Sequence, residues 1–200
     1  MTVATEAPAQ AIAAHPITRQ EYARLPEGPP YHELISSQLV ERSPKSSRRH
    51  AEIQAYLIEM LGPHARGVLQ GRLFMGPSLY LPGTENVYQP DLVYLSRSQH
   101  SIVKEDGLYG VPSLICEILL PATASRDRYL KTDAYCRAGV PHYWIFDAEE
   151  VAVQEFVLAD DGYYRVQAVA TPPAVWSPLA FPGWSFDLGA TLAVFTDPTA

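Results

Sequence analysis

Apolar positions along this chain follow two spacings, one typical of helices and one typical of buried strands. Intervals of three and four separate a set of apolar residues in the first half of the chain, namely Ile53, Tyr56, Leu57, Met60 and Leu61. This spacing predicts an amphipathic helix over residues 46–61 that ends at Gly62 and Pro63. Residues 91–95 and 114–120 are short, nearly continuous apolar runs, which indicate strands covered on both faces.

Shorter signals complete the order of elements. Thr18 and Glu21 form a capping-box pattern, which predicts a short helix over 18–25. Gly139 ends a second long helix, predicted over 125–138. Further strands are predicted over 31–35 and 38–42 (a hairpin around Ser36-Ser37), 68–74, 78–81, 142–147, 151–158 and 163–170, with a last segment at 184–188. This order predicts an α/β fold: a central mixed β-sheet flanked by helices, with an N-terminal β-hairpin and a C-terminal β-meander.

The composition is that of one folded domain. The chain has 200 residues, of which 47% are hydrophobic and 18% charged. We expect a single domain over 17–200 and a disordered tail over 1–16, because the tail lacks the basic and apolar stretches of a signal peptide. No run approaches the roughly 18 apolar residues that a membrane helix needs. We therefore expect a soluble, cytoplasmic protein with no membrane partner, whose two cysteines, Cys116 and Cys136, are reduced.

Charge limits how the protein could contact nucleic acid. The net charge of −7 argues against broad electrostatic wrapping, although a local basic groove stays compatible with it. One basic cluster, Arg42, Lys45, Arg48 and Arg49, lies near the start of the predicted helix, where the helix dipole disfavours cations. Contact with backbone phosphates is one interpretation of this cluster, and a solvated segment is the more common one.

Two carboxylates lie within the predicted buried strands. Asp91 begins one strand, and Glu117 lies in the middle of the other, with Ile115 and Leu119 on its face. A buried acid is costly unless a cation, a proton or hydrogen bonds compensate it. Asp91, Glu117 and the backbone carbonyl of Ile118 are therefore candidate ligands for Mg²⁺ or Mn²⁺, which prefer oxygen donors.

A lysine on the following helix can complete this site. Lys131 lies four residues after Asp127 and four before Tyr135, so the three share one helix face. An ammonium there would orient an attacking water or stabilise charge on a phosphate. The alternative is an exposed Asp–Lys pair that only decorates the helix. The combination of two buried acids and a lysine in this order favours a catalytic site.

Several segments together resemble the Uma2 family. They are Tyr31-His32-Glu33-Leu34-Ile35, Pro90-Asp91, Glu117-Ile118-Leu119-Leu120-Pro121, the positions Asp127, Lys131 and Tyr135, and Gly139-Val140-Pro141-His142-Tyr143-Trp144. Uma2 proteins are regarded as restriction-endonuclease-like members of the PD-(D/E)XK nuclease superfamily, and the resemblance extends from about Thr18 to Phe195. It implies a restriction-endonuclease-like core, binding of a divalent metal and phosphodiester hydrolysis, with Asp91 and Glu117 as the acidic motif residues.

The chain also departs from the family pattern. Leu119 stands where the superfamily usually has a lysine, so Lys131 would replace that lysine from the next helix. Leu120 and His142 stand where the family usually has a serine and a glutamate. These substitutions are compatible with a degenerate or specialised member.

Two more residues are candidates on the same resemblance. Glu33 matches the family's Tyr-Glu-Leu-Ile pattern and could supply a third acid near the metal; a local salt bridge within the hairpin is the alternative. His50, at the start of the predicted helix, could contact a phosphate or assist proton transfer. A packed histidine at a helix end is the more common case.

The main hypothesis is a metal-dependent endonuclease that hydrolyses phosphodiester bonds in DNA. Asp91 and Glu117 would bind the ion, Lys131 would orient water or stabilise charge, and Glu33 would assist. Cutting both strands of a duplex needs two such sites, so we expect a homodimer. Two alternatives stay open: a nuclease-fold protein that binds nucleic acid or regulates without turnover, and a hydrolase of another phosphate ester. The sequence lacks the His-Glu-x-x-His, Cys-x-x-Cys, Walker and Gly-x-Ser-x-Gly motifs of other enzyme classes.

Overall fold

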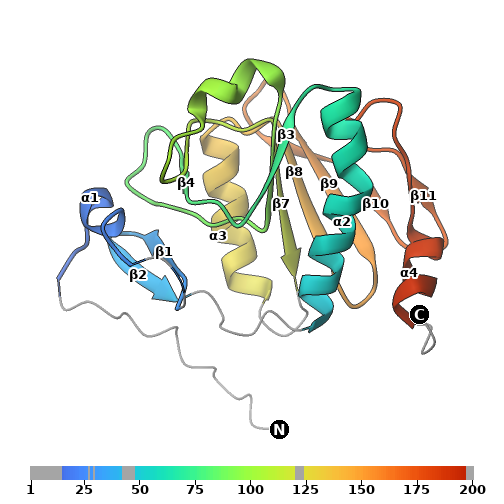
Figure 1. The fold of residues 1–200 in the computed structure, drawn as a ribbon, viewed down its shortest axis with the longest axis horizontal. Helices are drawn as coiled ribbons and strands as arrows, with labels where there is room; N and C mark the ends of the chain where they lie inside the picture. The colour runs from blue at the N-terminus through green and yellow to red at the C-terminus, as the bar shows by residue number, and fades with distance from the viewer. Residues whose placement is uncertain (1–14, 27, 29, 42–47, 120–123, 197–200) are drawn as a thin grey trace, which may run out of the picture.

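The centre of the molecule is a six-stranded mixed sheet with a long helix on each face (Figure 1). A computed structural model describes residues 15–26, 28, 30–41, 48–119 and 124–196, with the backbone alone for 124–128. The strand order is β10-β9-β8-β7-β5-β3, and within it β7 and β8 run parallel while the other neighbours are antiparallel. The strands are β3 (Arg72–Met75), β5 (Leu92–Leu95), β7 (Leu114–Leu119), β8 (His142–Asp147), β9 (Ala152–Leu158) and β10 (Tyr164–Ala170). The predicted α/β fold with a central mixed sheet is confirmed, and the strands predicted as a C-terminal meander are the antiparallel pair β9 and β10, which continues from β8.

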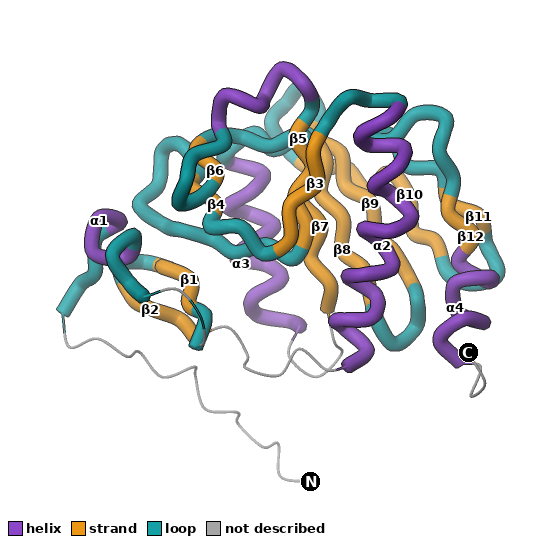
Figure 2. The backbone as a smooth tube through the Cα atoms, in the orientation of Figure 1, coloured by secondary structure: helices purple, strands orange, loops and turns teal. Residues whose placement is uncertain are grey.

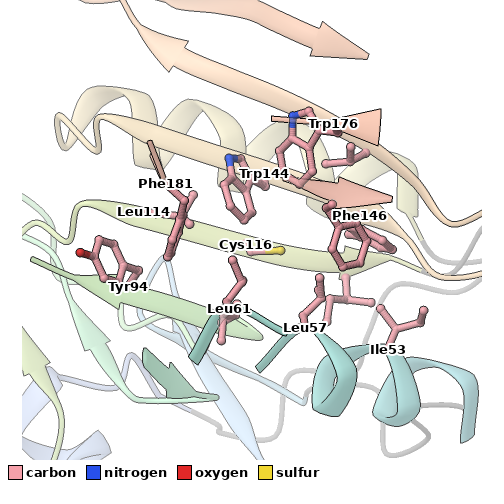
Figure 3. Close-up of a cluster of buried hydrophobic side chains, with 14 of the residues drawn as sticks. Ile53, Leu57, Leu61, Tyr94, Leu114, Cys116, Trp144, Phe146, Trp176 and Phe181 are labelled. Atoms are coloured by element: carbon pink, nitrogen blue, oxygen red, sulfur yellow. The ribbon is translucent and has the colours of Figure 1, made fainter. Parts of the chain in front are cut away.

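Helix α2 (Arg48–Gly67) covers one face of the sheet with an apolar stripe (Figure 3). The residues Ile53, Leu57 and Leu61 lie at helical spacing and are at most 1% exposed. They pack against a layer of side chains from the sheet and the C-terminal segment, which includes Leu114, Cys116, Trp144, Phe146, Trp176 and Phe181. Each large apolar side chain buried in this way contributes about 1.5–3 kcal/mol. This layer of buried apolar side chains holds the sheet and the helix together.

Helix α3 (Ala124–Arg137) covers the opposite face. Alternate residues of a strand point to opposite sides of a sheet, so β7 gives Ile115 to this face and Cys116 to the other. Ile115 joins a second core that includes Tyr135 of α3 together with Tyr143 and Ile145 of β8. Figure 2 shows the two helices on the two sides of the strands.

An N-terminal hairpin leans against the side of the molecule on which α3 lies. Strands β1 (His32–Ile35) and β2 (Gln38–Glu41) pair as predicted, and the turn residues Ser36 and Ser37 take positive φ of 50° and 62°. Those values belong to the tight hairpin turns that usually contain glycine. Leu34 exchanges two backbone hydrogen bonds with Val87, which joins the hairpin to the main body. Before it, the short helix α1 (Arg19–Tyr22) has the predicted capping box.

Small elements surround this core. They are β4 (Leu79–Tyr80) paired with β6 (Leu108–Tyr109), the 3₁₀ helix η1 (Arg97–Ile102), β11 (Val175–Trp176) paired with β12 (Phe186–Asp187), and α4 (Leu188–Thr196). Helix α4 was not predicted from the sequence. Asp187 accepts a hydrogen bond from the backbone N–H of Ala190 at 2.8 Å, an N-terminal capping contact that a search for Asp before an apolar run could have found.

The predicted end of the first long helix at Gly62-Pro63 is wrong. Helix α2 continues through Pro63 to Gly67. Proline inside a helix removes one backbone hydrogen bond and crowds the preceding turn. Gly62 and Ala65 are nevertheless buried, so packing of this last stretch against the core outweighs the local preference to stop.

The strand predicted over 68–74 is also displaced. Residues 68–70 form the turn after α2, where Gln70 has φ 54°, and β3 begins only at Arg72. Gly71 fixes this boundary, because a Cβ there would lie 2.5 Å from the carbonyl oxygen of Leu95. The strand predicted over 78–81 is the two-residue β4 and lies outside the main sheet.

Other expectations meet the structure only in part. Almost all of the predicted tail at 1–16, together with Arg42 and Lys45, lies outside the described residues. Within the described chain no helix is both long and apolar enough to cross a membrane. Cys116 and Cys136 are both free thiols, as predicted.

Candidate functional site

The register between β5 and β7 brings Asp91 and Glu117 to the same end of the sheet. Leu92 lies opposite Cys116 in this antiparallel pair, so Asp91, directly before β5, faces Glu117 across the ladder. Opposed residues have Cβ atoms about 4.5–5.5 Å apart. Both side chains are buried, at 3% and 4% exposure. This end of the sheet, where β7 finishes and α2 begins, is at the lower edge of Figure 1.

Asp91 is held by contacts on its side chain and its backbone. Its Oδ2 accepts a hydrogen bond from the N–H of Ile118 at 2.8 Å, and its Oδ1 lies 3.2 Å from Nε2 of His50. Its carbonyl oxygen accepts from the side-chain amide of Gln54 at 2.6 Å and from the N–H of Gly76 at 3.2 Å. These partners come from three different segments, so the carboxylate is fixed in place before any ligand arrives.

Glu117 receives two donors from helix α3. The Tyr135 hydroxyl donates to Oε1 at 2.7 Å, and Nζ of Lys131 lies 3.2 Å from the same oxygen. The other oxygen, Oε2, has no hydrogen-bond partner among the described residues. One oxygen of Glu117 is thus tied to the protein, and no described residue donates a hydrogen bond to the other.

Lys131 is the cation at the centre of this arrangement. Its ammonium lies 2.9 Å from Oε1 of Glu33 and 3.2 Å from Oε1 of Glu117, and its side chain is only 16% exposed. Lys131 is therefore not the exposed side chain that the alternative interpretation required. The side chain of Asp127 lies outside the described residues. Of the two acids expected beside this amine, Glu117 contacts it directly, and Asp91 lies opposite Glu117 on the neighbouring strand.

Glu33 joins the same cluster from the hairpin. It is 6% exposed, and its Oε1 accepts a hydrogen bond from the N–H of Gln89 at 2.8 Å in addition to the contact with Lys131. Its salt bridge therefore crosses from β1 to α3 and is not local to the hairpin. Lys131 is shared between two carboxylates from two different elements.

His50 and Arg49 differ in what they contact. His50 reaches Asp91 from the first turn of α2, so it belongs to the site. Arg49 points away from it: its guanidinium donates to the carbonyl oxygens of Ala148 at 3.0 Å and Phe195 at 3.2 Å, and it lies over the Phe195 ring. Arg49 therefore fits neither interpretation of the basic cluster, phosphate contact or a solvated segment, because its contacts join α2 to the C-terminal helix.

Burial and neighbouring charges shift the acid–base behaviour of the site. Burial, together with the negative charges of Asp91 and Glu33, raises the pKa of Glu117 to about 7, although Lys131 and Tyr135 oppose the shift. Burial alone would lower the pKa of Lys131, but Glu117 and Glu33 outweigh it and raise that pKa above its usual value. Lys131 is accordingly an ammonium at neutral pH. It suits charge stabilisation and cannot serve as a base.

The site contains oxygen donors of the kind that small divalent cations prefer. Glu33 and Glu117 contact Lys131, and Asp91 lies opposite Glu117, so the three carboxylates outnumber the lysine when the acids are ionised. In an extended strand the N–H and C=O of one residue point to the same side, so the Ile118 carbonyl turns toward Asp91 as its N–H does. Among the described residues no three His, Cys, Asp or Glu side chains form a group that could hold a metal ion by themselves. Mg²⁺ typically uses only one or two carboxylates and keeps several waters.

Sequence reasoning missed two supporting residues. Gln54 and Gln89 hold Asp91 and Glu33 through the contacts described above. Gln54 lies four residues after His50, on the same helix face, which is a signal that the helical spacing offered. Gln89 donates through its backbone, which no side-chain pattern reveals.

Comparison with known proteins agrees with this fold. Residues 19–193 match the sequence model of the family described as "Uma2: Putative restriction endonuclease". A crystal structure from Anabaena variabilis ATCC 29413, described as a "putative nuclease belonging to DUF820", superposes with a TM-score of 0.68 at 19% identity, over 86% of this chain and 96% of that one. At this identity the likeness concerns the fold. No curated protein matches significantly. Because the family match spans most of the sequence, the chain belongs to the Uma2 family of restriction-endonuclease-like proteins.

Proposed function

We propose that this protein is a metal-dependent endonuclease that hydrolyses phosphodiester bonds in DNA. One observation carries the proposal: Asp91, Glu117, Lys131 and Glu33, which come from four separate segments, meet in a single buried cluster. Burying three acids and a lysine is costly, and a purely structural core would be at least as stable with apolar residues. The match to a family described as putative restriction endonucleases supports a nuclease role for this cluster.

Asp91, Glu117 and the Ile118 carbonyl would hold Mg²⁺ or Mn²⁺. When bound, such an ion polarises a phosphoryl oxygen and makes water a nucleophile near neutral pH. The protein's own part is to fix the ligands: Ile118 and His50 hold the carboxylate of Asp91, and Tyr135 holds one oxygen of Glu117. Ligands that are already in place avoid the cost of reorganisation during the reaction.

Lys131 would stabilise the negative charge that develops on the phosphate. Its raised pKa keeps the ammonium charged, and its two carboxylate partners fix where that charge lies. Glu33 then acts through Lys131, as the residue that positions the ammonium. Leu119 takes the position on β7 where the superfamily usually has its lysine, and the side chain from α3 supplies the missing cation.

A plasmid-nicking assay tests the proposal. Wild-type protein should nick supercoiled DNA in Mg²⁺ or Mn²⁺ and not in EDTA. Asp91→Ala, Glu117→Ala and Lys131→Ala should each abolish nicking. The exposed residues Lys104 and Glu149 offer matched controls, so Lys104→Ala and Glu149→Gln should nick at the wild-type rate.

Three other outcomes would contradict the proposal. Binding of DNA without cleavage by any of these proteins would identify a nucleic-acid-binding protein without turnover. Metal-dependent release of phosphate from small esters, with DNA left intact, would identify a different hydrolase. Cleavage that survives Lys131→Ala would remove the lysine from the mechanism. Because a duplex has two strands, we also propose a homodimer, and sedimentation of the wild-type protein with and without DNA measures this.

A further inference from the structure

A cluster of arginines lies at the opposite end of the sheet from the acidic site. Arg66, Arg72 and Arg97, together with His100, line an open hollow of about 450 Å³. Gln70 and Gly71 complete its lining, and none of these residues is acidic. In a chain with a net charge of −7, this is a local concentration of positive charge.

These arginines come from three elements that meet only in the folded chain. Arg66 lies in the last turn of α2, Arg72 begins β3, and Arg97 begins η1. A cation at the end of α2 is favoured by the helix dipole, which would account for Arg66 alone. It does not account for the other two.

The arginines of the hollow differ from other exposed arginines in their contacts with the described carboxylates. Three other exposed arginines of the described chain each pair with a carboxylate: Arg48 with Glu52, Arg137 with Asp133 and Arg165 with Asp161. No carboxylate of the described residues pairs with any of the three arginines that line the hollow. Guanidinium groups without a carboxylate partner that line one hollow suit phosphate, which arginine binds through paired hydrogen bonds.

The hollow is built on fixed backbone. Gly71 cannot carry a side chain, since a Cβ would lie 2.3 Å from the Tyr94 ring, and its N–H donates to the carbonyl oxygen of Ala65 at 2.8 Å. Gln70 takes a positive φ of 54° beside it and accepts a short hydrogen bond from the Arg97 guanidinium. Arg97 is therefore oriented by Gln70, and a phosphate would meet a cation that is already in place.

The hollow and the acidic site lie at opposite ends of α2. Arg66 follows His50 by sixteen residues on α2, a separation of about 24 Å along the helix axis at about 1.5 Å per residue. That distance equals about seven nucleotide steps, because one strand of duplex DNA rises about 3.4 Å per step. In Figure 1 the acidic site is at the lower end of α2, and η1, in light green, lies at the top beside its other end.

We propose that the hollow lined by Arg66, Arg72 and Arg97 binds the phosphate backbone of DNA at a distance from the scissile bond. The proposal rests on the nucleic-acid substrate of the proposed function and adds where the substrate is held. A smaller adjoining hollow of about 210 Å³ shares Arg66 and Arg72 and is lined by Ile58, Leu73 and Phe74, which suits the apolar face of a deoxyribose. Backbone contacts of this kind supply affinity and register without reading sequence.

Salt-dependent binding of a labelled duplex of about 20 base pairs tests the proposal, measured by fluorescence anisotropy in EDTA so that no cleavage occurs. Arg72→Gln and Arg97→Gln should each weaken binding roughly five- to tenfold at about 100 mM salt and reduce the slope of log K against log salt by about one. Arg97→Lys should keep most of the slope. Arg165→Gln is the matched control, since it removes the same charge from β10, the opposite edge strand of the sheet, and should change little. Circular dichroism confirms that each variant is folded.

The outcomes separate this proposal from the nuclease proposal. If Arg72→Gln and Arg97→Gln bind the duplex with wild-type affinity and salt slope, and both still nick DNA, the proposed role of the hollow is wrong and the nuclease proposal stands. If the salt slope falls in those variants but neither they nor the wild type nick DNA, the hollow is supported as a DNA contact and the nuclease proposal is wrong. Absence of duplex binding by the wild type overturns the hollow as a DNA contact. Competition by dAMP at micromolar concentration would overturn it in favour of a free nucleotide.

Discussion

The two faces of strand β7 differ in what they bury. Toward α2 the strand presents Leu114, Cys116 and Ile118 to a core made of apolar and aromatic side chains. Toward α3 it presents Ile115 and Glu117, and Lys131 and Tyr135 of α3 donate hydrogen bonds to Glu117. The alternation of one strand thus separates a face that stabilises the fold from a face that carries charge.

This difference shows how the protein can hold a costly cluster. Each buried ion near Glu117 opposes folding unless its partners are in place, whereas the side chains that β7 presents to α2 are all apolar. The α2 face also buries one acid, Glu155, whose carboxylate accepts hydrogen bonds from the Trp176 indole and the backbone N–H of Leu179. The apolar face keeps β5 and β7 in register, and that register sets Asp91 opposite Glu117. Substitutions of apolar residues on the α2 face should therefore lower stability, whereas removing a charge on the α3 face should change how stability depends on pH.

The largest effect on stability is expected from the apolar face. Trp144 is fully buried there, in edge-to-face contact with Trp176 at 4.6 Å between ring centroids. Trp144→Ala should lower the free energy of unfolding by about 3–5 kcal/mol, measured by urea denaturation, because it leaves a cavity in a packed core. A loss below about 1 kcal/mol would show that this face does not dominate stability.

The charged face should respond to pH instead. The folded-state pKa of Glu117 is about 7 and its ordinary value is 4.5, so between these values the folded state holds a proton that the unfolded state has lost. Stability in EDTA should therefore fall as pH rises from about 4.5 to about 7, by no more than about 3 kcal/mol, since one pKa unit is about 1.4 kcal/mol.

Glu117→Gln isolates this contribution. The variant keeps the shape but cannot ionise, so its advantage in stability over the wild type should grow across the same pH range. Urea unfolding at pH 5 and pH 7.5 measures the difference, and the exposed Glu149→Gln is the control. Parallel pH curves for wild type and Glu117→Gln would contradict the assigned pKa shift.

A smaller effect is expected from Glu33, which acts on the reaction only by positioning Lys131. Glu33→Gln leaves Lys131 with Glu117 as its remaining carboxylate partner and removes one of the two charges that orient the ammonium. Nicking should fall about 10- to 100-fold without being abolished, as is usual for residues that position a ligand or a catalytic group. Equal nicking rates in Glu33→Gln and wild type would limit Glu33 to a structural role.

The smallest effect is expected at the rim of α2, from two adjacent arginines. Arg49→Ala removes two hydrogen bonds to backbone carbonyls and the contact with the Phe195 ring, so it should cost about 1–2 kcal/mol. Arg48→Ala removes only an exposed pair with Glu52 and should stay within about 0.5 kcal/mol. Thermal unfolding of both variants makes the comparison, and equal shifts in Tm would contradict it.

The sequence by itself determined the order of elements and the identity of the charged cluster. Apolar spacing predicted α2 and the buried strands, and the rarity of unpaired acids in such strands identified Asp91 and Glu117. The helical spacing of Lys131 and Tyr135 placed both on one face of α3. Local patterns of this kind act over a few residues, and they can therefore be read from the chain directly.

The tertiary structure alone decided what depends on contacts between distant segments. Pro63 lies inside α2 because burial of Ala65 outweighs a lost hydrogen bond, and no local rule expresses that balance. The partner of Lys131 in the hairpin, the fastening of Arg49 to the C-terminal helix, and the meeting of Arg66, Arg72 and Arg97 all join residues far apart in the chain. Such contacts follow from strand register and helix packing, which fix distances that sequence separation does not.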